Sequence, residues 1–361
     1  MAKTRIGVDI GSTAVRVAEV SGGDVPVVVR AAQVSLPPGA VENGEVRESD
    51  VVAEALRDLW GKAGVRSKQV HLGVGNQRVV VREIVLPWLP EKELRDSLAF
   101  QVQEFIPMAS DEAVLDFDAL GELDQGGRRM QRILLVAAHK PMVQALVGAA
   151  VAAKLDPVGI DLTPFAVVRA IGTSDEGLDL ESQGDEAVID VGAHVTTICV
   201  HDRGLTRFVR ILPSGGRDVT LAIARGLGLD DAIAESLKRG EPVELPADEE
   251  GKPQELPDPA DVRRLALARA GSFVDEVRSS LEFYAAQVPG ARIARVVVTG
   301  GGSRLEGFLP LLQERIPVPV DRGHLFERAK SELNLDAEAS EEAEALLGVA
   351  VGLGLVDRRR A

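Results

Sequence analysis

The same short pattern occurs twice in this chain, and the repetition constrains the fold more than any other feature. Residues 6–20 place two runs rich in β-branched residues on either side of a turn that contains Asp9 and Gly11, which predicts a β-hairpin. Residues 188–200 repeat this plan around Asp190 and Gly192. The two aspartates lie 181 residues apart in a chain of 361. A repeat at half-length predicts two similar lobes.

Each turn combines groups that suit a phosphate chain. Gly11 allows a tight turn and lets an anion approach the backbone N–H groups. Ser12 and Thr13 add hydroxyl donors, and an aspartate at the end of a strand can hold the hydration water of a metal ion. A structural turn is the alternative for either hairpin taken alone. Two such hairpins that face each other would grip one phosphate chain from both sides.

A third turn is built almost entirely of glycine. Residues 296–299 form a strand of the buried type that leads into the turn 300–303 (Gly-Gly-Gly-Ser), and residues 305–315 then have a helical pattern. A strand, a glycine turn and a helix let a nucleotide lie against the backbone. The turn is not a Walker A motif, because no Gly-Lys-Ser/Thr ends it, and it is not a G-x-G-x-x-G motif at the chain start.

The composition restricts the class of partner and the compartment. The formal net charge is −15 and the isoelectric point is about 4.9, which argues against a nucleic-acid partner and against broad contact with anionic lipid. The single cysteine, Cys199, cannot form an internal disulfide and fits a reducing compartment. The sequence shows no signal peptide and no apolar run of about 18 residues. We therefore expect a cytoplasmic protein that does not insert into the membrane.

In this order the three turns resemble the two phosphate loops and the adenosine loop of the superfamily of actin, heat-shock chaperones and sugar kinases. The resemblance implies an α/β fold of two ribonuclease H-like lobes that bind ATP and Mg²⁺ in the cleft between them. It implies that Asp9 and Asp190 hold the metal through water, since Mg²⁺ keeps most of its hydration shell. The nucleotide-binding residues that it implies are Asp9, Gly11, Ser12, Thr13, Arg16, Asp190, Gly192, Ala193, Thr196, Gly215, Gly216, Glu235, Lys238, Gly300, Gly301, Gly302 and Ser303.

Some of these positions depart from the superfamily pattern or leave an alternative open. Glu235 and Lys238 lie one helical turn apart, and a simple surface ion pair is the alternative for them. His194 stands where the second phosphate loop often has glycine, so its larger side chain alters the geometry beside the phosphates. Thr163 stands where relatives have a glutamate or glutamine that positions water. Because threonine is a poor base, we expect slow hydrolysis of ATP or none, with Thr163 as the candidate catalytic residue.

A small α/β unit interrupts the first lobe, and its sequence narrows the resemblance from the superfamily to one family within it. Residues 81–87, 103–107 and 278–284 are similar to strings of the PilM family of type IV pilus assembly proteins, which is related to the cell-division protein FtsA. The alternative for residues 103–107 is an amphipathic helix that happens to end in Phe-Ile-Pro. The resemblance implies a first lobe at 1–78 and 155–185, an inserted subdomain at 79–154, a second lobe at 186–361 with an outer subdomain at 217–291, and a helix at 345–356 that crosses between the lobes.

The PilM resemblance implies an ATP-binding, actin-like adaptor in the inner-membrane platform of the type IV pilus or of a related type II secretion system. It implies that the cytosolic N-terminal peptide of the membrane protein PilN docks in extended form between the first lobe and the inserted subdomain. That contact would hold the chain at the inner face of the membrane. Phe105, Ile106 and Pro107 are the candidates for the groove. The pilus assembly ATPase is a further candidate partner, and self-association stays open.

Two other functions stay open at this point. A small-molecule kinase of the sugar or acetate type would share the ATP motifs, but it needs a catalytic carboxylate or arginine in a substrate pocket, and the sequence offers no strong candidate. An FtsA-like, filament-forming protein of cell division would share the fold. For the adaptor, we expect at most a slow ATPase activity.

Overall fold

The first lobe is built on one mixed sheet. Its strands are β1 (Thr4–Ile10), β2 (Ala14–Ser21), β3 (Val27–Ser35), β6 (Gln69–Val74), β10 (Asp156–Leu162) and β16 (Lys330–Ser331). The strand order is β10-β6-β1-β2-β3-β16. The strands β1, β2 and β3 form an antiparallel meander, whereas β6 lies parallel to β1 and β10 lies parallel to β6. The computed structural model describes residues 4–172, 184–246, 255–288 and 290–355.

The second lobe repeats this construction. Its strands are β11 (Asp185–Val191), β12 (Thr196–Asp202), β13 (Leu205–Leu212), β14 (Ile293–Thr299) and β15 (Val320–Arg322), in the order β13-β12-β11-β14-β15. Here too an antiparallel meander is followed by parallel strands. Asp9 lies opposite Arg16 in the first hairpin, and Asp190 lies opposite Thr197 in the second. The predicted duplication is therefore confirmed.

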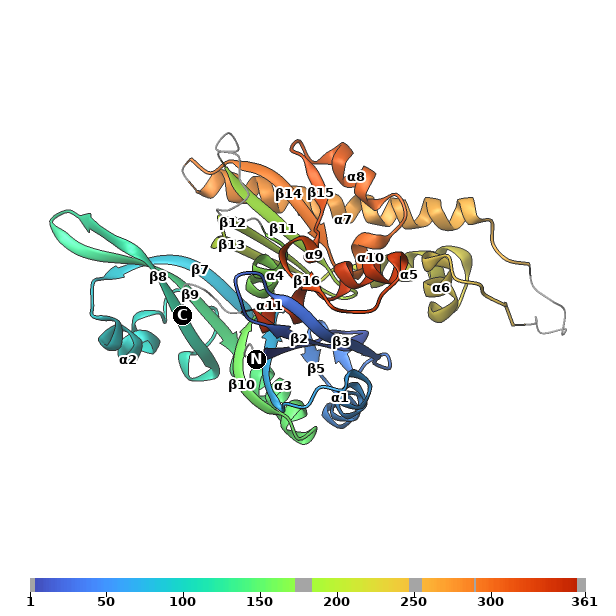
Figure 1. Cartoon of the computed structure of the whole chain (residues 1–361). Coiled ribbons are helices and arrows are strands. Elements are labelled where there is room, and N and C mark those ends of the chain that lie inside the picture. The colour runs from blue at the N-terminus through green and yellow to red at the C-terminus, as the bar shows by residue number, and fades with distance from the viewer. Residues whose placement is uncertain (1–3, 173–183, 247–254, 289, 356–361) are drawn as a thin grey trace.

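Two helices lie between the sheets, α4 (Thr163–Ile171) and α11 (Gly348–Gly354). Figure 1 shows α11 beside the first sheet and α4 between the two lobes. The helix α4 contacts β11 and β12, α11 contacts β1 and β2, and the two helices pack on each other. Buried residues of both sheets and both helices, such as Ala18, Ala166 and Cys199, form one shared core. The lobes are thus joined through this helix pair.

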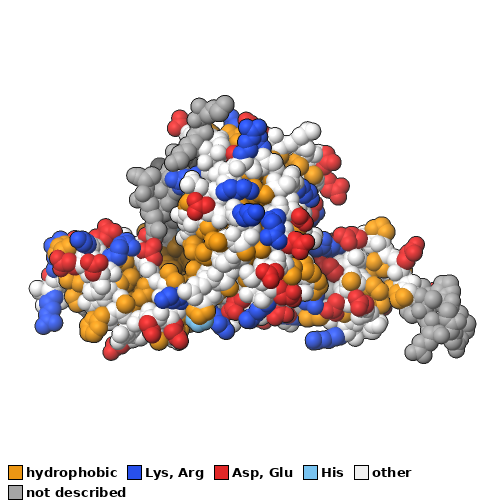
Figure 2. All heavy atoms as spheres, turned by 90° about the horizontal axis from the view of Figure 1, so that it is seen from below, with side chains coloured by type: hydrophobic (Ala, Val, Ile, Leu, Met, Phe, Trp, Pro, Cys, Tyr) orange, Lys and Arg blue, Asp and Glu red, His pale blue; other side chains and the backbone are white. Residues whose placement is uncertain are grey.

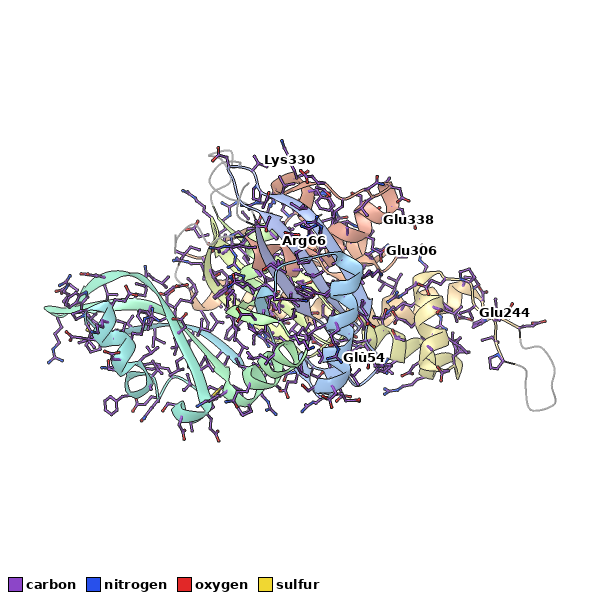
Figure 3. The ribbon with its side chains drawn as sticks, turned by 60° about the horizontal axis from the view of Figure 1, so that its bottom comes forward. Glu54, Arg66, Glu244, Glu306, Lys330 and Glu338 are labelled. Atoms are coloured by element: carbon purple, nitrogen blue, oxygen red, sulfur yellow. The ribbon has the colours of Figure 1, made fainter. Side chains whose placement is uncertain are left out.

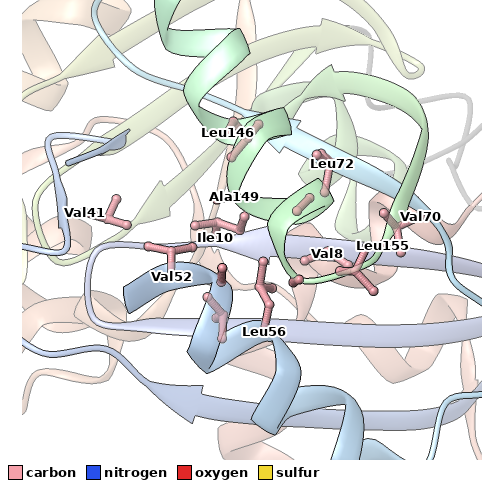
Figure 4. Close-up of a cluster of buried hydrophobic side chains, with 14 of the residues drawn as sticks. Val8, Ile10, Val41, Val52, Leu56, Val70, Leu72, Leu146, Ala149 and Leu155 are labelled. Atoms are coloured by element: carbon pink, nitrogen blue, oxygen red, sulfur yellow. The ribbon is translucent and has the colours of Figure 1, made fainter. Parts of the chain in front are cut away.

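The outer face of the first sheet is covered by α1 (Ser49–Ala63) and α3 (Lys140–Ala152). The helix α1 forms because apolar residues recur at helical spacing, and its Val52 and Leu56 pack toward Val8 and Ile10 of β1 (Figure 4). Glu54, on the opposite side of α1, is exposed to solvent (Figure 3). A short hairpin of β4 (Val41–Glu42) and β5 (Glu45–Val46) precedes α1. This packing fixes the position of the first turn.

The inserted unit projects from the first lobe as a small body of its own (Figure 1). It contains β7 (Val79–Pro87), α2 (Glu91–Gln101), the 3₁₀ helix η1 (Ser110–Glu112), β8 (Ala113–Gln125) and β9 (Arg128–His139), with the strand order β7-β9-β8. Its own core includes Ile84, Leu98 and Ile133. The helix α3 packs instead on the first sheet beside α1. The unit with a separate core is therefore smaller than the predicted span 79–154.

The outer part of the second lobe consists of α5 (Gly216–Leu227), α6 (Asp231–Arg239) and the first turns of α7 (Pro259–Gln287). Val262 and Ala266 of α7 share a core with α5 and α6. Further along α7, Phe273 and Leu281 belong to the core of the second sheet. The predicted outer subdomain at 217–291 therefore shares its longest helix with the sheet.

The last part of the described chain returns to the first lobe. After the 3₁₀ helix η2 (Gly301–Arg304), α8 (Phe308–Arg315) and α9 (Leu325–Arg328), the strand β16 pairs with β3. The helix α10 (Ala337–Leu346) then precedes α11, with Leu347 between them. The predicted crossing helix at 345–356 thus covers the end of α10 and all of α11, and its residue 356 lies outside the described residues.

Candidate functional site

Both hairpin turns open onto one cleft between the lobes, with a volume of about 1320 Å³. The first lobe lines it with Asp9 and residues 11–13, and the second lobe lines it with Asp190 and residues 192–195. Both aspartates stand near the ends of central strands, so the matching registers of the two sheets bring them to the same opening. Glu306 and Glu338 also line the cleft, and Figure 3 shows them on the same side of the second lobe.

The two aspartates dominate the electrostatics of the cleft. Asp9 Oδ2 lies 3.3 Å from Nη1 of Arg16. Burial raises the pKa of Asp9 above its ordinary value, and the charge of Arg16 opposes that shift. Burial and the nearby charge of Asp9 raise the pKa of Asp190 to about 7, with Arg16 again in opposition. Two carboxyl groups that resist ionisation in this way form a site that a cation would stabilise.

Asp190→Asn is expected to stabilise the protein most at alkaline pH. The folded-state pKa of Asp190 is about 7, against an ordinary value of 3.8. The folded state therefore keeps a proton that the unfolded state releases, and stability falls as the pH rises through this window. We expect the gain in the free energy of unfolding at pH 8 to be about two to three times the gain at pH 5. Urea unfolding without Mg²⁺ measures both, and an equal gain at the two pH values would contradict the shift.

The tips of the two hairpin turns offer backbone donors to the cleft. Each turn closes with a hydrogen bond from its glycine N–H to the carbonyl three residues later, at 3.1 Å for Gly11 and 3.0 Å for Gly192. Among the described residues, no acceptor binds the backbone N–H groups of residues 12–13 or 193–194. Successive N–H groups at the tip of a turn form an anion-binding concavity. The arrangement is therefore suited to phosphate oxygens.

The turn Gly215-Gly216 is bonded directly to the second hairpin turn. The N–H of Gly216 donates to the carbonyl of Gly192 at 2.9 Å, and the N–H of Arg217 donates to the carbonyl of Ala193 at 2.9 Å. A Cβ atom on Gly215 would lie 2.8 Å from that Ala193 carbonyl, so a larger residue does not fit. The helix α5 begins at Gly216, and its positive end therefore adds to the attraction for an anion.

In the third turn only the two middle residues face the cleft. Gly301 and Gly302 line it. Gly300 has a φ of 87° and donates its N–H to the carbonyl of Ala345 at 3.1 Å. Ser303 is buried, and its Oγ donates to the carbonyl of Gly300 at 2.7 Å. Gly300 and Ser303 shape the turn, and their predicted role as nucleotide-binding residues stays a prediction.

Two neighbouring threonines on β12 differ in whether they reach the cleft. Thr196 is fully buried, and its Oγ1 donates to the carbonyl of Ser214 at 2.8 Å. Thr197, opposite Asp190, lines the cleft. Successive side chains of a strand point to opposite faces, so only one of the two can reach a ligand. The side chain of Thr196 is thus turned away from the cleft that Thr197 lines, and a role of Thr196 in nucleotide binding stays a prediction.

Two buried polar atoms at the cleft have no partner among the described residues, Arg16 Nε and Thr299 Oγ1. Thr299 lies beside Asp190 in the pairing of β14 with β11 and lines the cleft. Sequence reasoning missed it, although its position at the end of the strand before the glycine turn was a usable signal. An unsatisfied buried polar group costs about 1–3 kcal/mol. The location of Arg16 Nε and Thr299 Oγ1 beside the aspartates therefore fits a ligand that is rich in oxygen atoms.

The carboxylates of the cleft suit a hydrated cation. Among the described residues there is no group of three or more His, Cys, Asp or Glu side chains that could hold a metal ion. A divalent cation between Asp9 and Asp190 would therefore take most of its ligands from water and from a phosphate chain. Mg²⁺ prefers this type of coordination. The residues present thus fit Mg²⁺ together with a polyphosphate.

Glu235 and Lys238 both line the cleft. Lys238 Nζ donates to Glu235 Oε2 at 2.6 Å, to Thr220 Oγ1 at 2.9 Å and to the carbonyl of Gly216 at 3.0 Å. Burial raises the pKa of Glu235, but the ion pair with Lys238 outweighs it and the net shift is downward. The side chain of Lys238 is 13% exposed, so this is not a simple surface pair. With its three N–H groups engaged, Lys238 holds the turn at Gly216.

Thr163 and His194 also reach the cleft. Thr163 is the first residue of α4, and it packs so closely on Gly75 that no side chain would fit there. Its catalytic role stays a prediction. Burial and the charge of Arg217 lower the pKa of His194. His194 is therefore neutral at pH 7 and brings no positive charge to the second turn.

The candidate partner groove at residues 105–107 is only partly on the surface. Ile106 is 8% exposed and belongs to the core of the inserted unit. Phe105 packs against the same core, and only Pro107 is fully exposed. Ile106 packs into the core of the inserted unit after α2 ends, and its place in a partner groove stays a prediction.

The comparison with known families decides the identity of the chain. A family model described as type IV pilus assembly protein PilM matches residues 7–358. The chain belongs to the PilM family. Its fold is similar to a solved PilM-PilN type IV pilus biogenesis complex, at 27% identity and a TM-score of 0.82 over 98% of each chain.

Other relatives agree with this assignment. FtsA of Streptococcus pneumoniae is 25% identical over 87% of this chain and 74% of that protein. FtsA of Pseudomonas aeruginosa is 27% identical over 38% of this chain, a match that spans only 35% of the length of that protein.

The fold is also similar to that of EutJ from Carboxydothermus hydrogenoformans, with 16% identity, a TM-score of 0.58 and coverage of 98% and 90%. ADP-bound MreB5 of Spiroplasma citri has 11% identity, a TM-score of 0.56 and coverage of 99% and 97%. The predicted actin-like fold is confirmed. No described helix has the length and apolar character that crossing a membrane requires.

Proposed function

We propose that this PilM family member is an ATP-binding, actin-like adaptor that binds the cytosolic N-terminal peptide of a PilN-like membrane protein. The observation that carries the proposal is the likeness to the PilM-PilN complex over 98% of the chain, at a TM-score of 0.82. In this role the peptide holds the chain at the inner face of the membrane, where the type IV pilus is assembled.

The strand β10 offers an edge on which an extended peptide can dock. It is the end strand of the first sheet, so its outer edge has no neighbouring strand among the described residues. Val158 and Ile160 lie on one face of β10 and are 48% and 45% exposed, and Val151 of the adjacent α3 is 55% exposed. Figure 2 shows hydrophobic side chains on the underside of the first lobe next to the inserted unit. Strand addition would use both the free backbone groups and the apolar side chains.

Ile160→Asp is expected to weaken peptide binding at least about tenfold, since it places a charge against apolar peptide side chains. Anisotropy of a labelled N-terminal peptide of the cognate PilN measures the affinity. Val25→Asp is the matched control, because Val25 is similarly exposed, at 49%, and precedes β3 near the other edge of the sheet. An unchanged affinity in Ile160→Asp would move the docking site away from β10. No binding to the unchanged chain would reject the proposed function.

The proposed ligand of the cleft is ATP with Mg²⁺. The fold it shares with ADP-bound MreB5 supports this, as do the raised pKa values of Asp9 and Asp190 and the backbone N–H groups at the turn tips that have no acceptor among the described residues. Asp9 and Asp190 would hold the metal through water, residues 12–13 and 193–194 would bind phosphate, and Gly301 and Gly302 would lie against the adenosine. ATP would then act as a ligand that sets lobe closure.

A further inference from the structure

The two helices that join the lobes are tied at one polar point beyond the cleft. Arg169 of α4 donates from Nε to the carbonyl of Gly352 on α11 at 3.1 Å. It also donates from Nη2 to Asp161 Oδ2 on β10. The Arg169 and Asp161 side chains are 18% and 32% exposed. The other oxygen of Asp161 accepts the N–H of Leu162 at 2.7 Å, at the junction of β10 and α4. We call Arg169, Asp161 and the Gly352 carbonyl the clasp.

The clasp ties a helix that contacts both sheets to elements of the first lobe. The helix α4 packs on β11 and β12 of the second sheet and also on β6 and β10 of the first, whereas α11 packs on β1, β2 and β6, and β10 is itself a strand of the first sheet. A planar guanidinium can bind two acceptors at once, which a lysine ammonium does less well. A rotation of the second lobe against the first would shift α4 along α11. That shift either strains the clasp or moves Asp161 with it.

The opposite end of α4 lies in the cleft. Thr163 begins the helix and lines the cleft, and six residues further on Arg169 lies about 9 Å along the axis. Between them, the backbone at Ala166 is in such close contact with Gly352 that no Cβ atom would fit. Packing of this density transmits displacement rather than absorbing it. A change at Thr163 on lobe closure therefore reaches Arg169.

The clasp also includes a residue of β10, the strand on which the peptide is proposed to dock. Asp161 follows Ile160 on β10, and successive side chains of a strand point to opposite faces. Val158 and Ile160 would contact the peptide on one face, while Asp161 binds Arg169 on the other. We propose that Arg169 is a positioning residue that couples nucleotide binding in the cleft to peptide binding on β10. This inference rests on the proposed function and adds to it the side chain through which the two ligands affect each other.

The test is the ratio of peptide dissociation constants without nucleotide and with saturating Mg²⁺-ATP. In the unchanged chain we expect a ratio that differs from one by at least about fivefold, the lower range for coupled sites. In Arg169→Gln the ratio falls to less than about twofold while both ligands still bind. Asp161→Asn, which retains the size of the side chain, is expected to lower the ratio equally. Arg169→Lys is expected to give a ratio between those of the unchanged chain and Arg169→Gln. A merely structural role would change stability and leave the ratio as it was.

Arg57→Gln is the matched control. Arg57 also donates to a carbonyl at the end of a helix, Ala152 of α3 at 3.2 Å, but both groups belong to the first lobe. This variant is expected to keep the full ratio. An unchanged ratio in Arg169→Gln and Asp161→Asn, or a ratio near one in the unchanged chain, overturns the inference and leaves the adaptor intact. A peptide that binds no variant in any nucleotide state overturns both.

Discussion

Asp9→Asn is expected to weaken the binding of Mg²⁺-ATP by more than about 100-fold, which corresponds to about 2.7 kcal/mol. Asp9 is the next-to-last residue of β1 in the first sheet, and its carboxylate lines the cleft beside Arg16 at 3.3 Å. Asparagine keeps the size of the side chain and can still accept a hydrogen bond from Arg16. It cannot supply the negative charge that hydrated Mg²⁺ requires. Isothermal titration with ATP in excess Mg²⁺ measures the loss.

The titration is best made at pH 8, where Asp190, with a pKa of about 7, is ionised in both proteins. Asp58→Asn is the control, because Asp58 is exposed on α1, outside the cleft. It should bind ATP as the unchanged chain does. If Asp9→Asn lost less than about threefold in affinity, roughly 0.6 kcal/mol, the aspartate would have no part in holding the metal.

Gly352→Ala is expected to destabilise the fold by about 3 kcal/mol, the upper part of the usual range for overpacking. Gly352 lies on α11 where this helix crosses α4, and an added methyl group would overlap the backbone of Ala166. Relief would require the two helices to separate, and they form the core that joins the lobes. Urea unfolding, followed by circular dichroism, measures the change.

Gly148→Ala is the same substitution at another helix, and it is expected to change the stability in the opposite direction. Gly148 lies on the exposed side of α3, and an added methyl group there meets no other atom within 4 Å. Alanine is the better helix former by about 1 kcal/mol, so this variant should gain stability. Destabilisation of both variants by a similar amount would show that the helix crossing has no special constraint.

The duplicated hairpin pattern was the strongest indication of the two-lobed fold in the sequence. Asp9 and Asp190 are separated by half the chain, yet each is the next-to-last residue of a central strand and both line one cleft. The local pattern sufficed because a β-branched run, a glycine and a hydroxyl group define a hairpin wherever they occur. The adjacent Gly11 and Gly192 were predictable for the same reason.

The sequence was least informative where one residue or one packing partner decides the position of a side chain. The choice between Thr196 and Thr197 depends on the register of β12, and a shift of one residue reverses every side chain. The burial of Ile106 could not be foreseen, because it depends on how the segment after α2 packs on the core of the inserted unit. The helix α3 follows the inserted unit along the chain but packs on the first sheet. The contacts of Arg169 could not be predicted, because its partners, Asp161 and Gly352, meet it only in the folded chain.

The most direct test of the central claim is the binding of a labelled N-terminal peptide of the cognate PilN to the whole chain, measured with ATP, with ADP and without nucleotide in the presence of Mg²⁺. The account predicts saturable binding in at least one state and an affinity that changes with the nucleotide. Absence of binding in all three states would contradict it, leaving a PilM family member with an actin-like fold whose partner is not this peptide.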